Sequence, residues 1–417
     1  MKILWLCNIL LPEFSEVISF KPIPTGGWLT GLYNGILDSN SNCQFVFVCP
    51  YSKKDVFDYK RTKIYTYTHK EEKDVDFFKH ILLRENPDII HIHGTEFIHS
   101  YSMALAAKQL DLLPKTVVSL QGILFFYEKH FFASLEFKEI YGFSLRDLLK
   151  LDNVFFQRKR YRKIGIYEKQ TLLTCSNVIG RTTWDFACSK YLNPVVRYFK
   201  ANEILRKAFY FGQWCLEKCN RYSIFVTQSN YSIKGFHYLI KALPIIKKAF
   251  PEVHVFTTGR SILEPSFKER IKEKKYTKYL RRLIIRNHLE DNVTFLGTLT
   301  EEEVKNNLLS SHVFVLPSAI ENSPNSLGEA MILGVPCVAA NVGGIPDLLT
   351  DKVDGILYQY DADYMLAHYI IELFGNDELC VELSSNARKH AQETHSIATN
   401  VKSVLDIYSE IINGRNA

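Results

Sequence analysis

Short apolar runs alternate with longer, more polar stretches along both halves of the chain. In the first half this pattern predicts strands at residues 2–6, 44–48, 89–93 and 116–119. It predicts helices between them, among others at residues 28–37 and 101–110. In the second half strands are predicted at residues 223–227, 254–257, 293–296, 313–316 and 337–340. Such alternation is typical of parallel sheets with crossover helices, so we predict an α/β protein.

The two series of strands predict two Rossmann-like domains with a boundary near residues 205–222. We assign residues 1–205 to the first domain and residues 206–396 to the second. A last helix, at about 397–417, has apolar residues at helical spacing. Because ligands of open parallel sheets bind at the carboxyl ends of the strands, motifs that follow strands are the candidate site residues.

Composition narrows the class of protein. The chain has 417 residues, 47% hydrophobic and 23% charged, which is typical of a globular protein of two domains. The net charge of +6 suits a polyanionic ligand or an anionic membrane surface, and no nucleic-acid-binding motif is present. The nine scattered cysteines indicate reduced thiols, and the apolar start reads as a strand rather than a signal peptide. We therefore expect a cytoplasmic protein with no membrane-spanning segment.

Two glutamates eight positions apart, Glu321 and Glu329, flank a predicted helix start. Ser323 is a good N-cap and Pro324 suits the first helical position. The strand before them makes this helix start an anion site, because free backbone N–H groups and the helix dipole point outward there. Carboxylates accept hydrogen bonds from hydroxyl pairs, so a diphosphate flanked by hydroxyls, as in a nucleotide sugar, fits both features. Taken alone, the two glutamates are better explained as ordinary surface residues, and the surrounding sequence has to favour the other interpretation.

The surrounding sequence resembles a known family. Residues 313–344 read VFVLPSAIENSPNSLGEAMILGVPCVAANVGG. This run is similar to the signature of glycosyltransferase family 4, and the likeness extends along most of the chain. The resemblance implies the GT-B fold, in which two Rossmann-like domains face each other across a cleft and the last helix packs back on the first domain. It is strongest to bacterial enzymes that build capsules, O-antigens and other surface polysaccharides.

The resemblance also implies roles for individual residues. Glu321 contacts the donor sugar and stabilises positive charge at its anomeric carbon, and Glu329 holds the ribose hydroxyls. Lys234 and the helix start bind the diphosphate, and the nucleobase lies near Gly297 and Leu299. The remaining donor-binding candidates are Gly26, Gly27, Gln228, Asn322, Ser323, Pro324, Asn325, Ser326, Leu327 and Arg181.

The chain departs from the family pattern at two positions. Gln121 stands where many members have a histidine, and it can orient a hydroxyl or phosphate but cannot act as an acid or base. Gln228 stands where the family has a second diphosphate-binding arginine. Arg181 is our candidate to supply the missing charge from the other domain.

No metal site is predicted. His91, His93 and His99 lie at or after a predicted strand end, but no carboxylate–histidine cluster at ligand spacing accompanies them. No Asp-x-Asp follows a strand either. We expect no metal and no cofactor, with the nucleotide sugar acting as a substrate.

Residues 125–167 are dense in aromatic residues and end in a run of five cations between residues 157 and 163. Aromatic residues mixed with basic ones suit a membrane interface that carries anionic lipid, and also a lipid-diphosphate acceptor. A pair of core helices with a solvated basic turn explains the same pattern.

We predict a retaining, metal-independent glycosyltransferase. It moves a sugar from a nucleotide sugar, expected to be a UDP-sugar, to a lipid-linked or growing surface glycan. The expected partners are the nucleotide-sugar donor, a glycan or polyprenyl-diphosphate-linked acceptor and an anionic membrane at the inner face of the plasma membrane, but no nucleic acid. Three alternatives stay open: a sugar-nucleotide epimerase of the same fold, a GDP- or ADP-sugar transferase, and a non-catalytic partner subunit.

Overall fold

The computed structural model describes residues 1–21, 26–39 and 42–414, and these form two compact units. The first unit comprises Met1–Phe126, Arg162–Arg206 and His395–Ala417. The second unit comprises Tyr127–Tyr161 and Lys207–Thr394. Each unit has its own sheet, and the two are described separately.

The first unit contains an eight-stranded sheet in the order β3-β4-β2-β1-β5-β6-β7-β8. Every neighbouring pair is parallel except β3 and β4. The strands are β1 (Lys2–Leu6), β2 (Gln44–Pro50), β3 (Asp55–Tyr59), β4 (Thr62–Tyr67), β5 (Ile89–His93), β6 (Thr116–Ser119), β7 (Asn177–Gly180) and β8 (Arg197–Lys200). The strands predicted at residues 2–6, 89–93 and 116–119 are confirmed with the same bounds.

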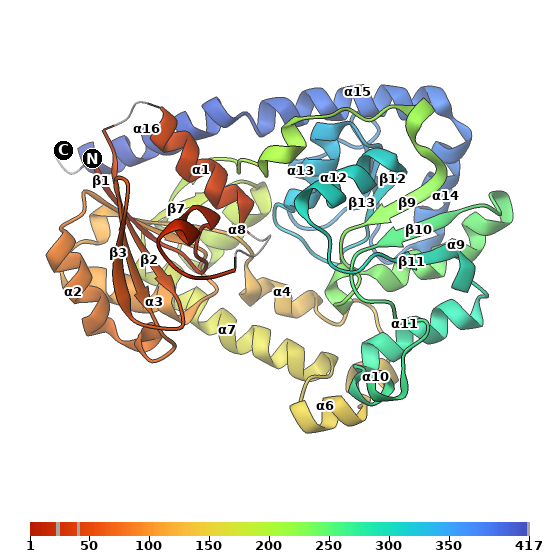
Figure 1. Cartoon of the computed structure of the whole chain (residues 1–417), viewed down its shortest axis with the longest axis horizontal. Helices are drawn as coiled ribbons and strands as arrows, with labels where there is room; N and C mark the ends of the chain where they lie inside the picture. The colour runs from red at the N-terminus through yellow and green to blue at the C-terminus, as the bar shows by residue number, and fades with distance from the viewer. Residues whose placement is uncertain (22–25, 40–41, 415–417) are drawn as a thin grey trace. The chain divides into compact units, whose positions relative to one another are not determined.

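The helices of the first unit are α1 (Gly27–Asp38), α2 (Val75–Glu85), α3 (Ile98–Gln109), α8 (Thr183–Leu192) and α16 (Ile397–Asn413). Figure 1 shows α2 and α3 side by side next to the sheet, and their apolar faces bury Phe78, Ile81 and Met103. Burial of such side chains contributes about 1.5–3 kcal/mol each. The predicted helix at residues 101–110 begins three residues earlier, at Ile98.

The C-terminal helix α16 packs against α1 within the first unit. Its Tyr408 is buried, accepts a hydrogen bond from the Trp5 indole N–H at 3.0 Å and lies 2.5 Å from His91 Nδ1. These contacts tie the last helix to β1 and β5 at the centre of the sheet. The final three residues of the predicted helix lie outside the described residues.

The loop between β1 and α1 contains a short helix. Residues Pro12–Glu16 form a 3-10 helix, and its Phe14 is buried against the rings of Tyr33 and Phe47. The buried Phe14 side chain therefore makes this part of the loop belong to the core of the first unit. Residues 22–25 of the loop lie outside the described residues.

The second unit contains a six-stranded, all-parallel sheet in the order β11-β10-β9-β12-β13-β14. Numbered by their order within the unit, the strands follow the doubly wound sequence 3-2-1-4-5-6. They are β9 (Asn220–Val226), β10 (His254–Thr257), β11 (Val293–Phe295), β12 (Ser311–Leu316), β13 (Cys337–Ala340) and β14 (Ile356–Tyr358). The helices between and after them are α9 (Phe236–Ala249), α10 (Phe267–Lys272), α11 (Lys275–Arg286), α12 (Glu301–Ser310), α13 (Asn325–Leu333), α14 (Asp363–Gly375) and α15 (Asp377–Thr394).

Residues 127–161 form a helical excursion that groups with the second unit, although the sequence assigned them to the first domain. The excursion includes most of α4 (Leu124–His130), α5 (Phe137–Tyr141), α6 (Leu145–Lys150) and the start of α7 (Val154–Thr174). The Ser232 hydroxyl donates to the Phe131 carbonyl at 3.1 Å, and His237 Nε2 lies 2.9 Å from the Ala133 carbonyl. Contacts between residues about a hundred positions apart therefore decide this grouping.

None of the described helices combines the length and the apolarity needed to cross a bilayer.

Candidate functional site

The candidate site of the second unit lies where the strand order of its sheet reverses. Strands β9 and β12 are neighbours, and the chain proceeds from β9 toward β11 on one side and from β12 toward β14 on the other. Open α/β sheets bind ligands at the carboxyl ends of the strands at such a switch point. The loops that follow β9, β12 and β13, at residues 227–235, 317–324 and 341–344, form what we term the loop site.

The first two loops are held tightly together. The Ala319 N–H donates to the Ile233 carbonyl at 2.8 Å. Gly235 has a φ of +69°, and a Cβ there would lie 1.7 Å from the Pro317 carbonyl oxygen. Glycine is therefore required at position 235 for both its left-handed backbone and the close approach.

Glu321 is the buried acceptor at the centre of the loop site. Its Oε1 lies 2.6 Å from Lys234 Nζ and accepts a hydrogen bond from the Ser318 hydroxyl at 2.8 Å. The backbone carbonyl of Glu321 accepts a hydrogen bond from the Gly344 N–H at 3.0 Å. A Cβ at Gly343 would lie 1.9 Å from that carbonyl oxygen. One residue thus joins a lysine from the first loop to the backbone of the third.

Helix α13 begins at Asn325, and its N-cap is Pro324, without a side-chain cap. The prediction that Ser323 caps the helix and Pro324 occupies its first position is therefore wrong by one residue. Pro324 has the extended backbone of a cap, with φ −73° and ψ 114°. The Leu327 N–H donates to the Pro324 carbonyl at 3.0 Å, while Asn325 and Ser326, the first two helical residues, precede the helical hydrogen-bond pattern. Their N–H groups keep the helix start a candidate anion site.

The other predicted residues of this stretch differ in exposure. Asn322 and Glu329 are buried, and Leu327 lies in the apolar core. Half-buried Ser323, Asn325 and Ser326 line the start of α13. Of this group, Ser323, Asn325 and Ser326 have the most accessible side chains.

Three further predicted positions lie in the first loop of the loop site and in the loop after β11. Gln228, in the first loop, is exposed, so its amide is available but not oriented by packing. Gly297 pairs in a short β-bridge with Gly259, and Leu299 is half-buried. After them, Thr300 and Glu303 form a capping box at the start of α12, in which the Thr300 N–H donates to Glu303 Oε2 at 2.7 Å.

The first unit has a small cavity of about 30 Å³ at the carboxyl edge of its own sheet. We term it the first-unit cavity. His93 and Ser119, the last residues of β5 and β6, line it, and so do Gln121 and the ring of Trp28. The remaining lining residues are Leu32, His91, Ile179, Arg181, Ala201, Asn202, Glu203, Ile204 and Val404.

The two histidines of β5 have different environments. His91 is held by Tyr408 and by the Ser119 hydroxyl, which lies 2.5 Å from its Nε2. His93 stacks on His91, with ring centroids 3.8 Å apart, and neither ring nitrogen of His93 has a hydrogen-bond partner among the described residues. Burial lowers the pKa of His91 to about 3 and that of His93 well below its usual range. Both rings are therefore neutral, and His93 offers one donor and one acceptor at the cavity.

Arg181 is buried in the first unit beside the same cavity. Its Nη1 lies 2.7 Å from Glu203 Oε1, and its guanidinium also donates to the Leu120 carbonyl. The charge of Arg181 is thus balanced by a carboxylate of its own unit. Gly26 and Gly27 lie at the start of α1, as N-cap and first helical residue.

Two acidic side chains, Glu96 in the loop that follows β5 and Glu168 on α7, lie close enough to interact. Glu168 accepts hydrogen bonds from the Phe125 N–H at 2.7 Å and from the Thr95 hydroxyl at 3.2 Å. Burial, and then the nearby Glu96 carboxyl, raise the pKa of Glu168 to about 8. Burial likewise raises the pKa of Glu96 to about 7. The pair therefore carries protons at neutral pH that isolated carboxyls would have lost.

Within the described ranges, no group of three or more His, Cys, Asp or Glu side chains is arranged to hold a metal ion. His99, the third histidine considered from the sequence, is buried and stacks on Phe97, with ring centroids 5.0 Å apart.

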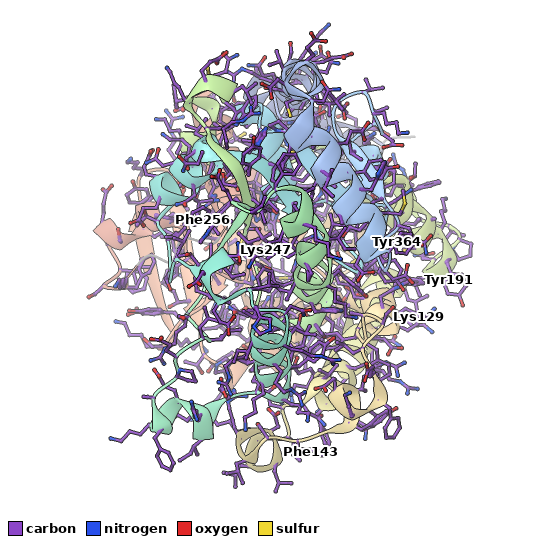
Figure 2. The ribbon with its side chains drawn as sticks, turned by 90° about the vertical axis from the view of Figure 1, so that its right-hand side faces the viewer. Lys129, Phe143, Tyr191, Lys247, Phe256 and Tyr364 are labelled. Carbon is purple, nitrogen blue, oxygen red and sulfur yellow. The ribbon has the colours of Figure 1, made fainter. Side chains whose placement is uncertain are left out.

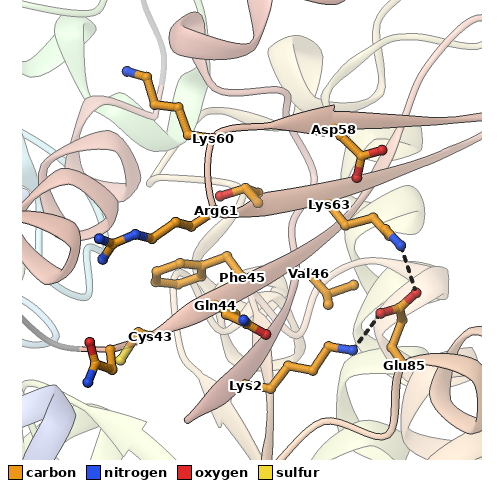
Figure 3. Close-up of a pocket in the computed structure, with 12 residues that line it drawn as sticks. Lys2, Cys43, Gln44, Phe45, Val46, Asp58, Lys60, Arg61, Lys63 and Glu85 are labelled. Carbon is orange, nitrogen blue, oxygen red and sulfur yellow. Dashed lines mark hydrogen bonds and ion pairs between the residues drawn. The ribbon is translucent and has the colours of Figure 1, made fainter.

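A larger cavity, of about 590 Å³, lies at the opposite, amino-terminal edge of the first sheet. Figure 3 shows Lys2 and Lys63 pointing at the Glu85 carboxylate, at 2.7 Å and 3.9 Å. Because ligands of such sheets bind at the other edge, and its buried acid is already paired, we read this cavity as structural.

Sequence reasoning missed three residues of the first-unit cavity: Trp28, His93 and Glu203. A signal for His93 was present, since it ends a predicted strand and the same rule selected Gln121. Nothing in the sequence pairs Glu203 with Arg181, because that contact depends on the path of the chain after β8.

The sequence of the second unit is similar to that of known proteins. Residues 209–390, which contain the whole loop site, match the family model described as "Glycosyl transferases group 1". The Bacillus subtilis glycosyltransferase YtcC is 26% identical over 186 residues, 44% of this chain and 44% of that protein. The Escherichia coli UDP-Gal:alpha-D-GlcNAc-diphosphoundecaprenol alpha-1,3-galactosyltransferase is 27% identical over 125 residues, 30% of this chain and 32% of that protein. The chain thus matches less than half the length of these two relatives.

The fold is shared over nearly the whole chain with solved structures. Anabaena HepE, in a crystal structure with UDP and glucose, superposes with a TM-score of 0.67 at 18% identity, covering 98% of this chain and 100% of that one. The predicted GT-B fold class, α/β with two Rossmann-like units, is thereby confirmed. The roles assigned to single residues stay predictions.

Proposed function

We propose that this protein is a retaining, metal-independent glycosyltransferase that moves a sugar from a UDP-sugar to a lipid-linked or growing surface glycan. The observation that carries the proposal is the buried Glu321 joined to Lys234 at the switch point of the second sheet. A carboxylate, a lysine and a helix start in one place provide partners for a sugar, a diphosphate and their connecting bond.

Each group of the loop site has a role in this proposal. Lys234 and the first N–H groups of α13 bind the diphosphate and stabilise its growing negative charge as it leaves. Glu321 faces the sugar and stabilises positive charge at the anomeric carbon. Glu329, one to two turns into α13, accepts hydrogen bonds from the ribose hydroxyls.

The reaction needs no separate base in this scheme. The bond between the anomeric carbon and the diphosphate oxygen breaks, and a bond from that carbon to an acceptor hydroxyl oxygen forms on the same face. The acceptor proton passes to the departing phosphate oxygen. With Gln228 in place of a second cation, leaving-group stabilisation depends more heavily on Lys234 and on the start of α13.

The proposed acceptor site is the first-unit cavity. Gln121 and neutral His93 orient an acceptor hydroxyl by hydrogen bonding, and the Trp28 ring offers an apolar face for a sugar. We also propose that Arg181 assists the diphosphate. Its ion pair with Glu203 is the competing explanation, in which Arg181 only stabilises the lining of the first-unit cavity. Unchanged donor affinity in Arg181→Ala would remove Arg181 from the donor site.

The comparisons support the choice of donor and acceptor. The solved HepE structure contains UDP and glucose, and the E. coli relative is named for UDP-Gal and a diphosphoundecaprenol-linked acceptor. We accordingly propose the cytoplasmic face of the membrane as the place of action, with the donor as substrate and no cofactor.

A thermal-shift panel tests the proposal. UDP, GDP, ADP and CMP, and their common sugars, are added in the presence of EDTA. A ligand at about 100 times its dissociation constant adds roughly 2.7 kcal/mol of stability. A rise in melting temperature with UDP compounds that persists in EDTA supports a UDP-sugar donor and metal-independent binding. A rise only with GDP or ADP compounds would instead identify a GDP- or ADP-sugar as the donor.

Turnover separates the remaining alternatives. A new sugar nucleotide formed without acceptor identifies an epimerase. No shift with any nucleotide and no turnover, together with co-purification of a second transferase, identifies a partner subunit.

A further inference from the structure

The short helix α6 turns its apolar face toward solvent. Leu145, Leu148 and Leu149 have the spacing of one helix face, and all three are exposed, Leu148 by 59% and Leu149 by 85%. Asp147, on the opposite face, is fully buried. An ordinary surface helix has the reverse arrangement, with its leucines packed and its charges in water.

Helix α10 also exposes apolar side chains, and it packs against α6. Phe267 and Ile271, one turn apart, are exposed, Phe267 by 79%. Phe143, just before α6, is exposed too and is labelled at the lower edge of Figure 2. We term the set Phe143, Leu145, Leu148, Leu149, Phe267 and Ile271 the apolar tip; α6 and α10 lie next to each other in Figure 1.

The apolar tip is fixed in place from its polar side. Buried Asp147 accepts the Lys275 N–H at 2.6 Å, and Asp152 pairs with Arg146 at 2.7 Å and with Arg160 at 2.8 Å. These polar contacts hold α6 in the orientation that leaves its leucines exposed.

The surroundings of the apolar tip are strongly basic. Residues 260–286, which contain α10 and α11, hold ten lysines and arginines against three glutamates, a net charge of +7, whereas the whole chain carries +6. Two of those glutamates, Glu269 and Glu273, are paired with Arg260 and Arg281. Lys150, Lys268 and Lys272 at the ends of α6 and α10 are exposed.

We propose that the apolar tip docks on an anionic lipid bilayer. Its leucine and phenylalanine side chains enter the boundary between headgroups and acyl chains, and the surrounding lysines contact lipid phosphates. Charge favours this occupant over a second copy of the chain, since a twofold contact would bring the same basic segments together. If the protein is the transferase proposed above, the apolar tip would bring it to its membrane-linked acceptor. Vesicle binding requires no enzyme activity and can therefore be tested separately.

Flotation of the full chain with phosphatidylcholine vesicles tests the docking, with and without about 30 mol% phosphatidylglycerol. We expect binding only to the anionic vesicles, and a loss of about tenfold or more in Leu148→Glu/Leu149→Glu. Leu83→Glu is the matched control, because Leu83 is 66% exposed on α2 and lies outside the tip. Lys268→Glu/Lys272→Glu should weaken binding mainly at low salt.

Equal binding of the tip variant and the control would overturn the proposal, and so would absence of binding to anionic vesicles by the unaltered chain. A dimer in light scattering that the tip variant dissociates would overturn it in favour of a subunit contact. The melting temperature and the nucleotide-induced shift of each variant show that its fold is intact. A failed nucleotide shift with intact vesicle binding would refute the proposed function alone.

Discussion

Lys234 Nζ lies 2.6 Å from Glu321 Oε1, although the two residues are 87 positions apart. The contact joins the loop after β9 to the loop after β12, at the point where the strand order of the second sheet reverses. The carboxylate holds the lysine in the place where an incoming diphosphate would need a cation. It also places a negative charge beside that diphosphate, so the two residues have opposing effects on anion binding.

This opposition predicts a non-additive pair of substitutions. Lys234→Ala should weaken UDP binding by roughly ten- to a hundredfold, because a charge-assisted contact is lost and Glu321 is left unpaired beside the diphosphate. In Lys234→Ala/Glu321→Gln the repulsive carboxylate is gone as well, so part of that affinity should return. Transfer activity should not return, since Glu321 is assigned to the sugar. Isothermal titration with UDP and a transfer assay measure the two effects.

Lys248→Ala is the control for charge, since Lys248 is an exposed lysine on α9, in the same unit. It should bind UDP like the unaltered protein. If the double variant binds no better than Lys234→Ala, the two side chains do not share a diphosphate site.

Glu329 is assigned to the ribose hydroxyls, and Glu329→Gln tests this role with little change of volume. Removing the charged acceptor should weaken UDP binding by about ten- to a hundredfold, because hydrogen bonds to a charged group contribute about 1.5–3 kcal/mol. Binding of inorganic diphosphate should change much less, as it has no ribose. Glu378→Gln, an exposed glutamate in the first turn of α15, is the control. An equal loss of UDP and diphosphate affinity would indicate a general disturbance of α13.

Gly235→Ala tests the close approach of the two loops. A Cβ at position 235 would meet the Pro317 carbonyl at 1.7 Å in addition to straining a φ of +69°. Gly297→Ala is a matched control, because Gly297 also has a positive φ, +76°, but a Cβ there meets no atom within 4 Å. We expect a cost of about 1 kcal/mol for Gly297→Ala and about 2–4 kcal/mol for Gly235→Ala, measured by urea unfolding. Equal losses of unfolding free energy in the two variants would show that the loops can move apart to accommodate the added Cβ.

The sequence predicted much of the sheet structure because central parallel strands are continuous apolar runs. Strands β1, β5, β6, β10 and β13 were predicted with the bounds that the structure has. Strand β14, at Ile356–Tyr358, was not predicted; it is three residues long and was missed, whereas the equally short β11 was found. Edge strand β3 was not predicted either; two of its five residues are aspartates, and Tyr59 is its one buried residue.

The contacts between distant segments were beyond the sequence pattern. Because ligands bind at the carboxyl ends of parallel strands, Lys234 and Glu321 were predicted to lie in one site. The hydrogen bond between their side chains was not predicted. The grouping of residues 127–161 with the second unit depends on contacts such as that of Asp147 with the Lys275 N–H. The basic run at residues 157–163 is partly structural, since Arg158 and Arg160 pair with Glu128 and Asp152. The exposed apolar face lies instead on α6 and α10.

Glu168 makes the stability of the first unit depend on pH. Burial raises its folded pKa to about 8, above the usual value of a glutamate near 4.3, so the folded state binds the proton more tightly than the unfolded state. The associated stability is fully present below the unfolded pKa and is lost as pH rises toward about 8. We expect the unfolding free energy to fall by roughly 1–3 kcal/mol between about pH 5 and pH 8. Glu168→Gln, which cannot ionise, should flatten that dependence, whereas Glu378→Gln should leave it unchanged. Urea unfolding at a series of pH values measures the slope, and a Glu168→Gln profile as steep as that of the unaltered protein would assign the titration to another group.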